Sequence, residues 1–480
     1  MEAAGPINPK ESVLPFWLHG LEIRTPSTFD VISPVNHEVM YQCSTASEAD
    51  VSVAVESANR AVQTWSRTKP HEKRDIFLRA AEIFARRKDE LFEYVNQETG
   101  EGQMFFDIEW DLIQQMCKDV AGLIQTIQGD HPTVVAPGHS ALVVREPYGV
   151  VAAIAPWNAP YILGLRSCLL PLAAGNTVVL KGPETAPKSF WAIADTLHQA
   201  GLPPGCLNTL YHRQSDAAPV TTALISHPLV QKINFTGSTA VGSIIASTAG
   251  KYLKPVLLEL GGKASAIVCP DADLQLAAAE CALGSFLNSG QICMSTERIL
   301  VHEEVATQFS EALKAAVARL FHDQTAQMVN AASLNKSKTL IQDAISKGAR
   351  ASRSTGVIPD KTTKMHLTLL ENVDPSMNIY HSESFGPSVS LITVTSDDEA
   401  IQIANDTEYG LTSAVFTEDL RRAFSIAKQI QSGAVHINGM TVHDETALPH
   451  GGMKRSGFGR FNAREGLSEW VRTKSVTWKD

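Results

Sequence analysis

One of the seven cysteines, Cys293, lies in a stretch whose composition favours chemistry over packing. Residues 289–296 read SGQICMST, so small and polar residues surround a single thiol. Such a sequence favours a turn beside a helix start, where backbone N–H groups lower the pKa of a thiol and activate it as a nucleophile. Most cysteines are small buried hydrophobic residues, and that interpretation fits the other six. Cys293 is therefore the candidate nucleophile.

Two polar residues end predicted apolar strands. Glu259 in LLELGGK is followed by Gly261 and Gly262, which leave room for a ligand or another backbone. Such a carboxylate is either a general base in an apolar cleft or a strand-terminal partner in a salt bridge. Asn158 in APWNAP ends an earlier strand, where its amide can hold an oxyanion or cap the following helix. Ligands of open α/β sheets bind at such strand ends, so both residues are candidate site residues.

Two further motifs are typical of nucleotide binding. VVLKGPE ends a strand with Lys181 and Glu184, which can hydrogen-bond ribose hydroxyls or form a solvated pair. NFTGSTAVG, at residues 234–242, predicts a strand, a Gly-Ser-Thr turn and a helix whose first N–H groups form a phosphate site. The motif is not G-x-G-x-x-G, so by itself it indicates a dinucleotide only weakly.

Composition excludes several classes of protein. The chain has 480 residues, which suggests two or three domains, and its 44% hydrophobic and 19% charged content is ordinary for a globular protein. A net charge of −10 without basic runs argues against nucleic acid as a partner. The odd number of cysteines without C-x-x-C argues against a disulfide framework or a zinc cluster and favours a reducing compartment, the cytoplasm. The N-terminus does not resemble a signal peptide, and prolines interrupt the one long apolar stretch, residues 148–165, so we expect no membrane span.

The elements that position these residues begin with a short β-rich arm at residues 22–47. A helix follows, with Ser47 as its N-cap and Asp50 in a variant of the capping box. Two more helical patterns cover about residues 73–95 and 106–127. This first third of the chain is therefore predicted to be mainly helical.

Residues 131–149 contain two β-branched arms around Pro137 and Gly138, which predicts a hairpin that leaves the body of its domain. From Val150 onward, short apolar runs alternate with helical segments, as expected for buried parallel strands in βαβ units. The first set of runs is VVAAIAP, NTVVLKG, CLNTLYH, KINFTG and PVLLEL. The second set, after Gly261, is ASAIVC, RILVH, SVSLITV, SAVFT and GAVHIN. The sequence thus predicts two α/β domains.

In this order and spacing the motifs resemble one family, the aldehyde dehydrogenase superfamily, from about residue 20 to the C-terminus. APWNAP, LELGGK and GQIC are its most specific motifs, joined by ESFGP at residues 383–387 and GGMKRSGFGR at residues 451–460. The resemblance implies that Cys293 attacks an aldehyde carbon to give a thiohemiacetal, with the oxyanion held by the Asn158 amide and the Cys293 N–H. Hydride then leaves for a nicotinamide, and Glu259 activates the water that hydrolyses the thioester to a carboxylic acid.

The resemblance also implies a dinucleotide cofactor. Lys181 and Glu184 match adenine-ribose contacts, and because a carboxylate at Glu184 repels a 2′-phosphate, NAD is favoured over NADP. The other implied cofactor-binding residues are Trp157, Gly237, Ser238, Glu383 and Phe385.

The architecture implied by the family is a Rossmann-like cofactor domain, an α/β catalytic domain and a small β oligomerisation arm. The cofactor domain would comprise residues 1–126 and 148–259, and the catalytic domain residues 260–448. Residues 127–147 and 449–480 would form the arm and the C-terminal segment, with the last strand, EWVRTKSVTW, pairing with the hairpin to join subunits. A homodimer or a homotetramer is expected.

Within the superfamily the chain most resembles the salicylaldehyde, vanillin and benzaldehyde dehydrogenases. The resemblance rests on PWNAP, on ILGLR with Arg166, and on HINGMTVHDE. Ala159 would widen the space near the carbonyl, Phe105 would stack on a flat ring, and Arg166 would hydrogen-bond an ortho-hydroxyl. Ile292 and Met294 would also line the substrate pocket. The alternatives are that the aromatic residues belong to the core and that Arg166 forms a structural ion pair.

His450 departs from the family pattern, because it stands where a phenylalanine is usual near the mouth of the substrate tunnel. There it would add a polar contact. The rival prediction for the whole chain is an aliphatic or semialdehyde dehydrogenase on the same scaffold, with a catalytically idle relative disfavoured because Cys293, Glu259 and Asn158 are all present.

Overall fold

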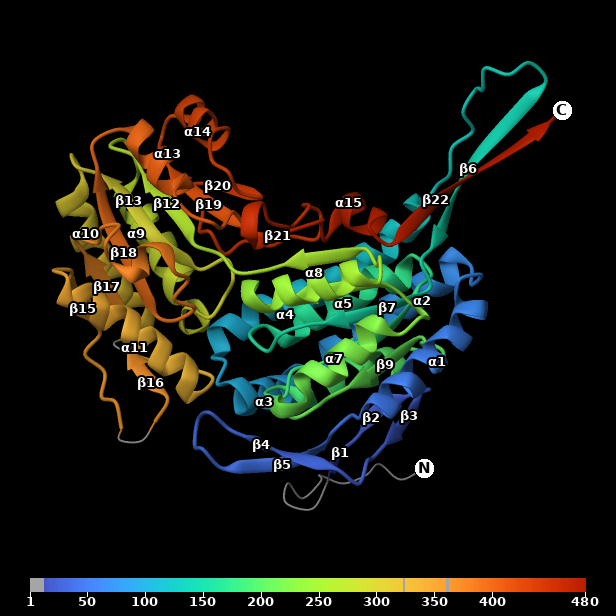
Figure 1. Cartoon of the computed structure of the whole chain (residues 1–480). Helices are drawn as coiled ribbons and strands as arrows, with labels where there is room; N and C mark the ends of the chain where they lie inside the picture. Colours follow the sequence, from blue (N-terminus) through green and yellow to red (C-terminus); the bar gives the residue numbers. More distant parts are fainter. Residues whose placement is uncertain (1–12, 323, 360–361) are drawn as a thin grey trace.

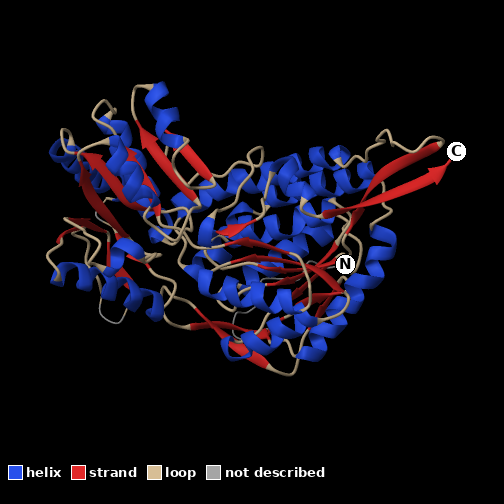
Figure 2. Cartoon of the chain, turned by 45° about the horizontal axis from the view of Figure 1, so that its top comes forward, coloured by secondary structure: helices blue, strands red, loops and turns tan. Residues whose placement is uncertain are grey.

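The computed structural model describes residues 13–322, 324–359 and 362–480. Two large sheets, each flanked by helices, lie side by side, and a long two-stranded arm projects from the body next to one of them (Figure 1, Figure 2). Helices and strands alternate along most of the chain, so the predicted α/β class is confirmed.

The first sheet has eight strands in the order β21-β11-β10-β7-β8-β9-β2-β3. Its five parallel strands match the first predicted set: β7 (Val150–Ile154), β8 (Thr177–Lys181), β9 (Leu207–Leu210), β10 (Val230–Thr236) and β11 (Val256–Glu259). Antiparallel strands complete its edges: β2 (Phe16–Leu18), β3 (Leu21–Ile23) and β21 (Gly457–Phe458). The winding direction reverses between β7 and β10, and a ligand crevice is expected at such a switch point.

The second sheet has seven strands in the order β15-β17-β18-β13-β12-β19-β20. The second predicted set is confirmed as its parallel strands: β12 (Ala264–Val268), β13 (Thr296–His302), β18 (Ser388–Val394), β19 (Thr412–Phe416) and β20 (Ala434–Ile437). β17 (Thr368–Glu371) adds to β18 in parallel, and β15 (Arg350–Arg353) is antiparallel at the edge. The position of the domain boundary, which we place between residues 259 and 260, stays a prediction.

The helices on and around the first sheet are α1 (Glu48–Trp65), α2 (Pro70–Arg86), α3 (Lys88–Thr99), α4 (Gln103–Leu123), α5 (Pro160–Ala173), α6 (Pro187–Gln199), α7 (Ala217–Ser226), α8 (Thr239–Lys251) and α15 (Ala463–Ser468). Those of the second sheet are α9 (Leu274–Phe286), α10 (Ala306–Phe321), α11 (Ala331–Ser346), α12 (Asn378–His381), α13 (Asp397–Asn405) and α14 (Leu420–Ala427). Ser47 caps α1 and forms the predicted capping box with Asp50.

The prediction of one helix over residues 73–95 is wrong, because the chain leaves helical geometry at Arg87, between α2 and α3. The Arg87 guanidinium donates to Asp195 at 2.7 Å and Thr196 at 2.8 Å on α6. This tertiary anchor stabilises the break, and neither glycine nor proline marks it in the sequence.

The arm differs from the predicted hairpin. Only its second half, β6 (His139–Pro147), is a strand, and it pairs antiparallel with β22 (Val471–Lys479) over nine residue pairs. Pairing with the last strand was implied by the family resemblance and is confirmed. The two arms around Pro137 and Gly138 are joined by a single antiparallel bridge, between Asp130 and Val143, rather than by a continuous ladder. Figure 1 shows β6 and β22 leaving the body together near the C-terminus.

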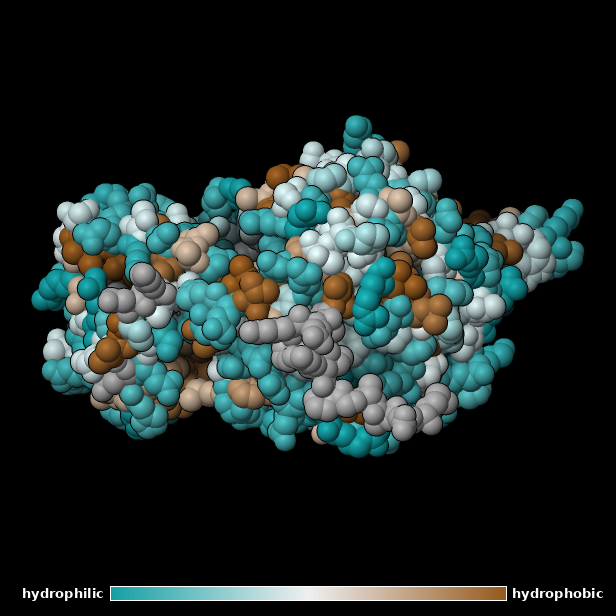
Figure 3. Space-filling model, turned by 90° about the horizontal axis from the view of Figure 1, so that it is seen from below, coloured by the Kyte–Doolittle hydropathy of each residue, from teal (hydrophilic) through white to brown (hydrophobic). Residues whose placement is uncertain are grey.

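Small sheets complete the described fold. β1 (Val13–Leu14), β5 (Val39–Ser44) and β4 (Thr28–Ile32) form the predicted N-terminal β-rich arm, and β14 (Thr325–Gln327) pairs with β16 (Lys364–His366). One hydrophobic core packs on each large sheet. The face in Figure 3 is mostly hydrophilic, with separate apolar patches. Among the residues that the structure describes, no helix has the length and apolar character needed to cross a bilayer.

Two buried carboxyl groups lie together at the start of α4. Glu101 and Glu109 are both fully buried, and neither has a hydrogen-bond partner outside the pair among the described residues. Burial raises the pKa of Glu109 to about 8, and burial together with the charge of Glu109 raises the pKa of Glu101 well above its ordinary value. The folded state therefore holds a proton that the unfolded chain releases at lower pH.

We expect Glu109→Gln to flatten the pH dependence of stability. A carboxyl whose pKa is raised by folding stabilises the protein at low pH and loses that contribution as pH rises from about 4.5 to 8. Between pH 6 and pH 8.5 the free energy of unfolding of the wild type should fall by about 1–3 kcal/mol more than that of the variant, so the melting temperature of the wild type should fall further. Differential scanning fluorimetry measures this, with the exposed Glu82→Gln on α2 as the control; parallel curves for the three proteins would contradict the prediction.

Candidate active site

A cavity of about 230 Å³ lies at the switch point of the first sheet, where it meets the second. Its walls come from the ends of β7, β10 and β11, from the turn before β13, and from α11. Eight of the predicted site residues line it: Trp157, Asn158, Gly237, Ser238, Glu259, Cys293, Glu383 and Phe385. The motifs from distant parts of the sequence are thus brought together.

Cys293 follows α9 and a short 3-10 turn and precedes β13. Three successive residues before it, Asn288, Ser289 and Gly290, have positive φ angles, so the chain reverses sharply. The predicted helix start is therefore wrong, because the thiol lies between a helix end and a strand start. A Cβ at Gly262 would lie 2.3 Å from the Cys293 carbonyl oxygen, so only glycine allows this approach.

The thiol is the only free cysteine of the seven that is not fully buried. Burial, followed by the negative charge of Glu259, raises the pKa of Cys293 well above its ordinary value. The predicted lowering by helix N–H groups is therefore wrong. In this state Cys293 holds its proton.

Glu259 ends β11 and is completely buried. Its Oε2 lies 3.3 Å from a guanidinium nitrogen of Arg166, and its Oε1 has no hydrogen-bond partner among the described residues. Both interpretations of the sequence thus apply to one side chain, which forms a salt bridge and also lines the cavity beside Cys293. One carboxylate oxygen is left to accept a proton.

Asn158 lies between the end of β7 and α5 and is buried. Its Nδ2 donates to the Gln291 carbonyl at 2.9 Å, and its backbone carbonyl accepts from Asn288 Nδ2 at 2.7 Å. The first bond holds the side-chain amide and the second holds the backbone against the turn that carries Cys293, and both Asn158 and Cys293 line the cavity.

The cavity continues to groups suited to a dinucleotide. Gly237 and Ser238 lead into α8, whose N-terminus can receive a phosphate, and Ser238 caps this helix by accepting from Val241 N–H at 3.4 Å. The Trp157 ring meets the Phe385 ring edge-on, with centroids 6.0 Å apart. The N–H groups of a helix N-terminus suit a pyrophosphate, and aromatic side chains suit a flat ring.

Glu383 accepts from the Gly262 N–H at 2.8 Å. Burial, with the nearby charge of Glu297, raises its pKa to about 7. A Cβ at Gly261 would lie 2.8 Å from the Glu383 carboxylate, which explains the first glycine of the pair. The LELGGK motif therefore supplies the Glu259 carboxylate and, through Gly261, the space for the Glu383 carboxylate.

Lys181 lies at the end of β8 but does not line the cavity. Its Nζ lies 2.6 Å from His212 Nε2, and burial lowers its pKa to about 8. His212 has a pKa lowered to about 4, by burial and the Lys181 charge, so at neutral pH its Nδ1–H donates to the Arg213 carbonyl and its Nε2 accepts from Lys181. Glu184 is partly exposed nearby.

The predicted substrate-pocket residues do not line the cavity. Ala159, Phe105, Ile292 and Met294 belong to the first hydrophobic core, and Arg166 is engaged in ion pairs. Phe105 is thus a core residue and Arg166 forms ion pairs, as the two alternatives from the sequence had it. The roles of both residues toward a substrate stay predictions. His450 is buried, and its Nε2 has no partner among the described residues.

Several cavity residues were not predicted. Ser333 and Lys336 reach it from α11, and Lys336 lies close enough to Glu383 to oppose the rise of its pKa. In the sequence, SLNKSK is indistinguishable from a solvated helix face, so no local signal identifies this lysine.

A thiol, a carboxylate and an amide thus meet beside a helix N-terminus where two α/β sheets join, as expected of an enzyme that pairs a nucleophile with a nucleotide cofactor. The profile of the aldehyde dehydrogenase family matches residues 22–476. The chain belongs to this family and is an oxidoreductase that acts on aldehydes.

Individual relatives agree with this assignment. A vanillin dehydrogenase of Pseudomonas fluorescens is 39% identical over 460 residues, with 94% of each chain covered. The crystal structure of a salicylaldehyde dehydrogenase from Pseudomonas putida G7, complexed with salicylaldehyde, superposes with a TM-score of 0.93 at 36% identity over 98% of each chain. A betaine aldehyde dehydrogenase from Staphylococcus aureus in complex with NAD+ gives a TM-score of 0.91 at 28% identity, covering 97% of this chain and 95% of the other.

Proposed function

We propose that the protein oxidises an aromatic aldehyde, of the salicylaldehyde type, to its carboxylic acid with NAD as the hydride acceptor. The observation that carries the proposal is the convergence of Cys293, Glu259 and Asn158 in one cavity with the N-terminus of α8. These groups support the class of reaction, and the similarity to vanillin and salicylaldehyde dehydrogenases supports the class of substrate.

In the first half of the reaction the Cys293 sulfur bonds to the aldehyde carbon, and the thiol proton leaves to solvent. The carbonyl oxygen becomes an oxyanion, held by the Asn158 amide and the Cys293 N–H. Bound NAD supplies an acceptor for the hydride that the carbon then loses, which leaves a thioester on Cys293. The rigid bonds of Asn158 to the Cys293 turn support this role, because a preorganised donor gains more than a mobile one.

In the second half Glu259 takes a proton from water as the water oxygen bonds to the thioester carbon. The carbon–sulfur bond breaks, the thiolate is protonated again, and the carboxylic acid leaves. The unpartnered Oε1 of Glu259 supports this role, because a general base needs a free lone pair within the cavity.

NAD is proposed over NADP because of Glu184. A carboxylate accepts from both ribose hydroxyls and repels a 2′-phosphate. Lys181 would contact the same ribose, because it lies close enough to Glu184 for the carboxylate charge to act on its pKa. Glu383, Phe385 and Trp157 would hold the nicotinamide side.

The test is NADH formation by the purified protein with salicylaldehyde, benzaldehyde, vanillin, hexanal and succinic semialdehyde. We expect the three ring aldehydes to exceed the others in kcat/KM by about a hundredfold, which is about 2.7 kcal/mol of transition-state preference. NAD should be preferred over NADP in the same assay. A lead for hexanal or the semialdehyde would overturn the aromatic assignment and leave the aldehyde dehydrogenase assignment intact.

The proposal extends to assembly and compartment. We propose that the arm of β6 and β22 joins subunits into a homodimer or homotetramer, supported by the exposed apolar side chains of Leu142, Val476 and Trp478 along it. A reducing compartment such as the cytoplasm is supported by the free state of all seven cysteines.

A further inference from the structure

Arg166 on α5 lies between two carboxylates. One guanidinium nitrogen is 3.3 Å from Glu259 Oε2, and the other is 2.9 Å from Asp444 Oδ2. The side chains of Arg166, Glu259 and Asp444 are only 2%, 0% and 7% exposed. Three charges are therefore withdrawn from water together, and each depends on its neighbours for compensation.

The two contacts of Arg166 differ in quality. The contact with Asp444 has normal hydrogen-bond length, whereas the contact with Glu259 is long and leaves the other carboxylate oxygen without a partner. The guanidinium also packs over the Phe461 ring, at 4.7 Å from the ring centre. Arg166 is thus anchored on the Asp444 side and holds Glu259 loosely.

Asp444 is itself fixed by the C-terminal segment. Its Oδ1 accepts from Asn462 Nδ2 at 2.7 Å, and the same amide donates to the Glu445 carbonyl at 3.2 Å. Asn462 has a φ of 60° with a ψ of 171°, a strained backbone conformation that is normally restricted to glycine, so the surrounding contacts hold it in place. A chain of contacts therefore runs from Asn462 through Asp444 and Arg166 to the carboxylate in the cavity.

We propose that Asp444, acting through Arg166, is a positioning residue that keeps the Glu259 carboxylate available to water in the hydrolytic half of the reaction. The inference rests on the proposed function. Asp444 takes up part of the Arg166 charge, so that Glu259 is neutralised enough to be buried yet not bound in a tight two-bonded pair. Without the Asp444 charge, Arg166 draws Glu259 away from Cys293 and makes it a weaker base.

Asp444→Asn is the direct test, since asparagine keeps the shape and an acceptor oxygen while removing the charge. We expect rapid-mixing assays to show a first-turnover burst of NADH close to that of the wild type, followed by a steady-state rate about tenfold lower, because loss of part of a general base effect of 10²–10⁴ slows hydrolysis alone. The slowing should be equal for salicylaldehyde and benzaldehyde. Arg166→Lys, which keeps a cation, should be slowed less than Arg166→Met.

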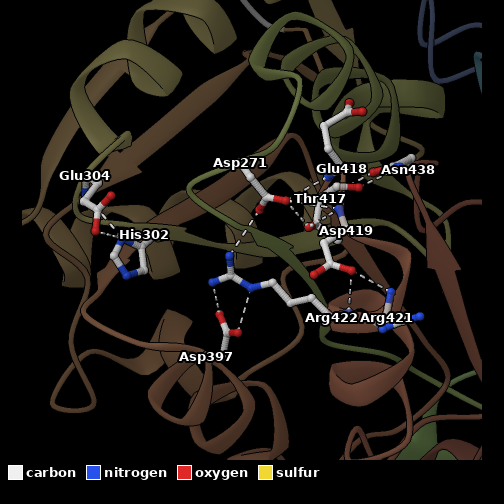
Figure 4. Close-up of polar contacts among 10 residues, drawn as sticks. All are labelled: Asp271, His302, Glu304, Asp397, Thr417, Glu418, Asp419, Arg421, Arg422 and Asn438. Atoms are coloured by element: carbon white, nitrogen blue, oxygen red, sulfur yellow. Dashed lines mark hydrogen bonds and ion pairs between the residues drawn. The ribbon is translucent and has the colours of Figure 1, made fainter.

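The chain offers a matched control in Arg422, which also lies between two carboxylates (Figure 4). Its Nη2 is 2.6 Å from Asp397 and its Nη1 is 3.2 Å from Asp271. This group lies at the carboxyl end of the second sheet, near the ends of β12 and β19, whereas Cys293 lies before the start of β13. Its side chains are 27–36% exposed, so Asp397→Asn controls for the loss of a carboxylate beside an arginine at a more exposed place away from the cavity. This variant should keep the ratio of burst to steady-state rate that the wild type has.

Three outcomes would overturn the inference: equal loss of burst and steady-state rate in Asp444→Asn, an unchanged steady state, or slowing confined to salicylaldehyde, which would assign Arg166 to the substrate hydroxyl. If Asp444→Asn does not fold, Asn462→Gly releases Asp444 while keeping both charges and the backbone geometry. In that variant the burst should again stay close to that of the wild type, and the steady-state rate should fall by a smaller factor. A wild type that oxidises none of the aldehydes would instead refute the proposed function.

Discussion

We expect replacement of Cys293 with alanine to abolish aldehyde oxidation while NAD binding survives. The substitution removes the sulfur that forms the covalent bond to the substrate carbon, and no second cysteine lines the cavity. The rate should fall by at least about 10⁴-fold, as expected when a nucleophile is lost and only binding contributions remain. Steady-state NADH formation measures the loss, and fluorescence titration with NADH measures the retained binding.

The matched control is Cys281→Ala, because Cys281 is a fully buried thiol on α9, a dozen residues before Cys293. It should retain activity, with at most a modest loss of stability from the space left in the core. Turnover in Cys293→Ala within about a hundredfold of the wild type would refute the nucleophile assignment.

Replacing Glu259 with glutamine separates the two halves of the reaction. Glutamine cannot take a proton from water, so hydrolysis of the thioester should slow by about 10²–10⁴-fold. Formation of the thioester should persist, because removal of the Glu259 charge also removes one of the causes that raise the pKa of Cys293. Rapid mixing should therefore show one equivalent of NADH per active site, followed by very slow turnover.

Mass spectrometry of the quenched Glu259→Gln protein provides a second measurement, since the acyl group should remain on the peptide that contains Cys293. An unchanged steady-state rate would remove the general-base role from Glu259. Loss of the burst would instead assign the carboxylate to the first half of the reaction.

Most of the fold follows from local patterns in the sequence. Strands buried on both faces must be continuously apolar, so the parallel strands of both sheets, such as β7 and β12, stand out from the amphipathic helices between them. The break at Arg87 was not predicted, and the partner of β6 came from the family resemblance rather than from local patterns, because contacts with α6 and β22 decide them. In both places tertiary contacts override the local preference.

The residues of the site also fall into those that local motifs indicate and those that only tertiary contacts bring together. Cys293, Glu259 and Asn158 lie in short motifs at the ends of elements, where polar residues and glycines interrupt apolar runs. Arg166 and Asp444 are separated by 278 positions in the sequence, and nothing local to either residue indicates that they meet. The pKa of Cys293 was predicted in the wrong direction for the same reason, because it is raised by burial in the assembled site and then by the charge of Glu259 from β11.

The β21 pairing bears on how the protein is made. Gly457 pairs with Glu259, and the neighbouring Ser456 accepts from Leu260 N–H at 3.0 Å through its carbonyl and donates to the Gly261 carbonyl at 2.6 Å. Synthesis runs from the N-terminus, and domains begin to fold as they emerge from the ribosome. The edge of β11, the strand that carries Glu259, therefore stays unpaired while about two hundred further residues are translated. A nascent chain on the ribosome can bury its first core, yet it becomes a competent enzyme only after this late segment has been released and has closed that edge.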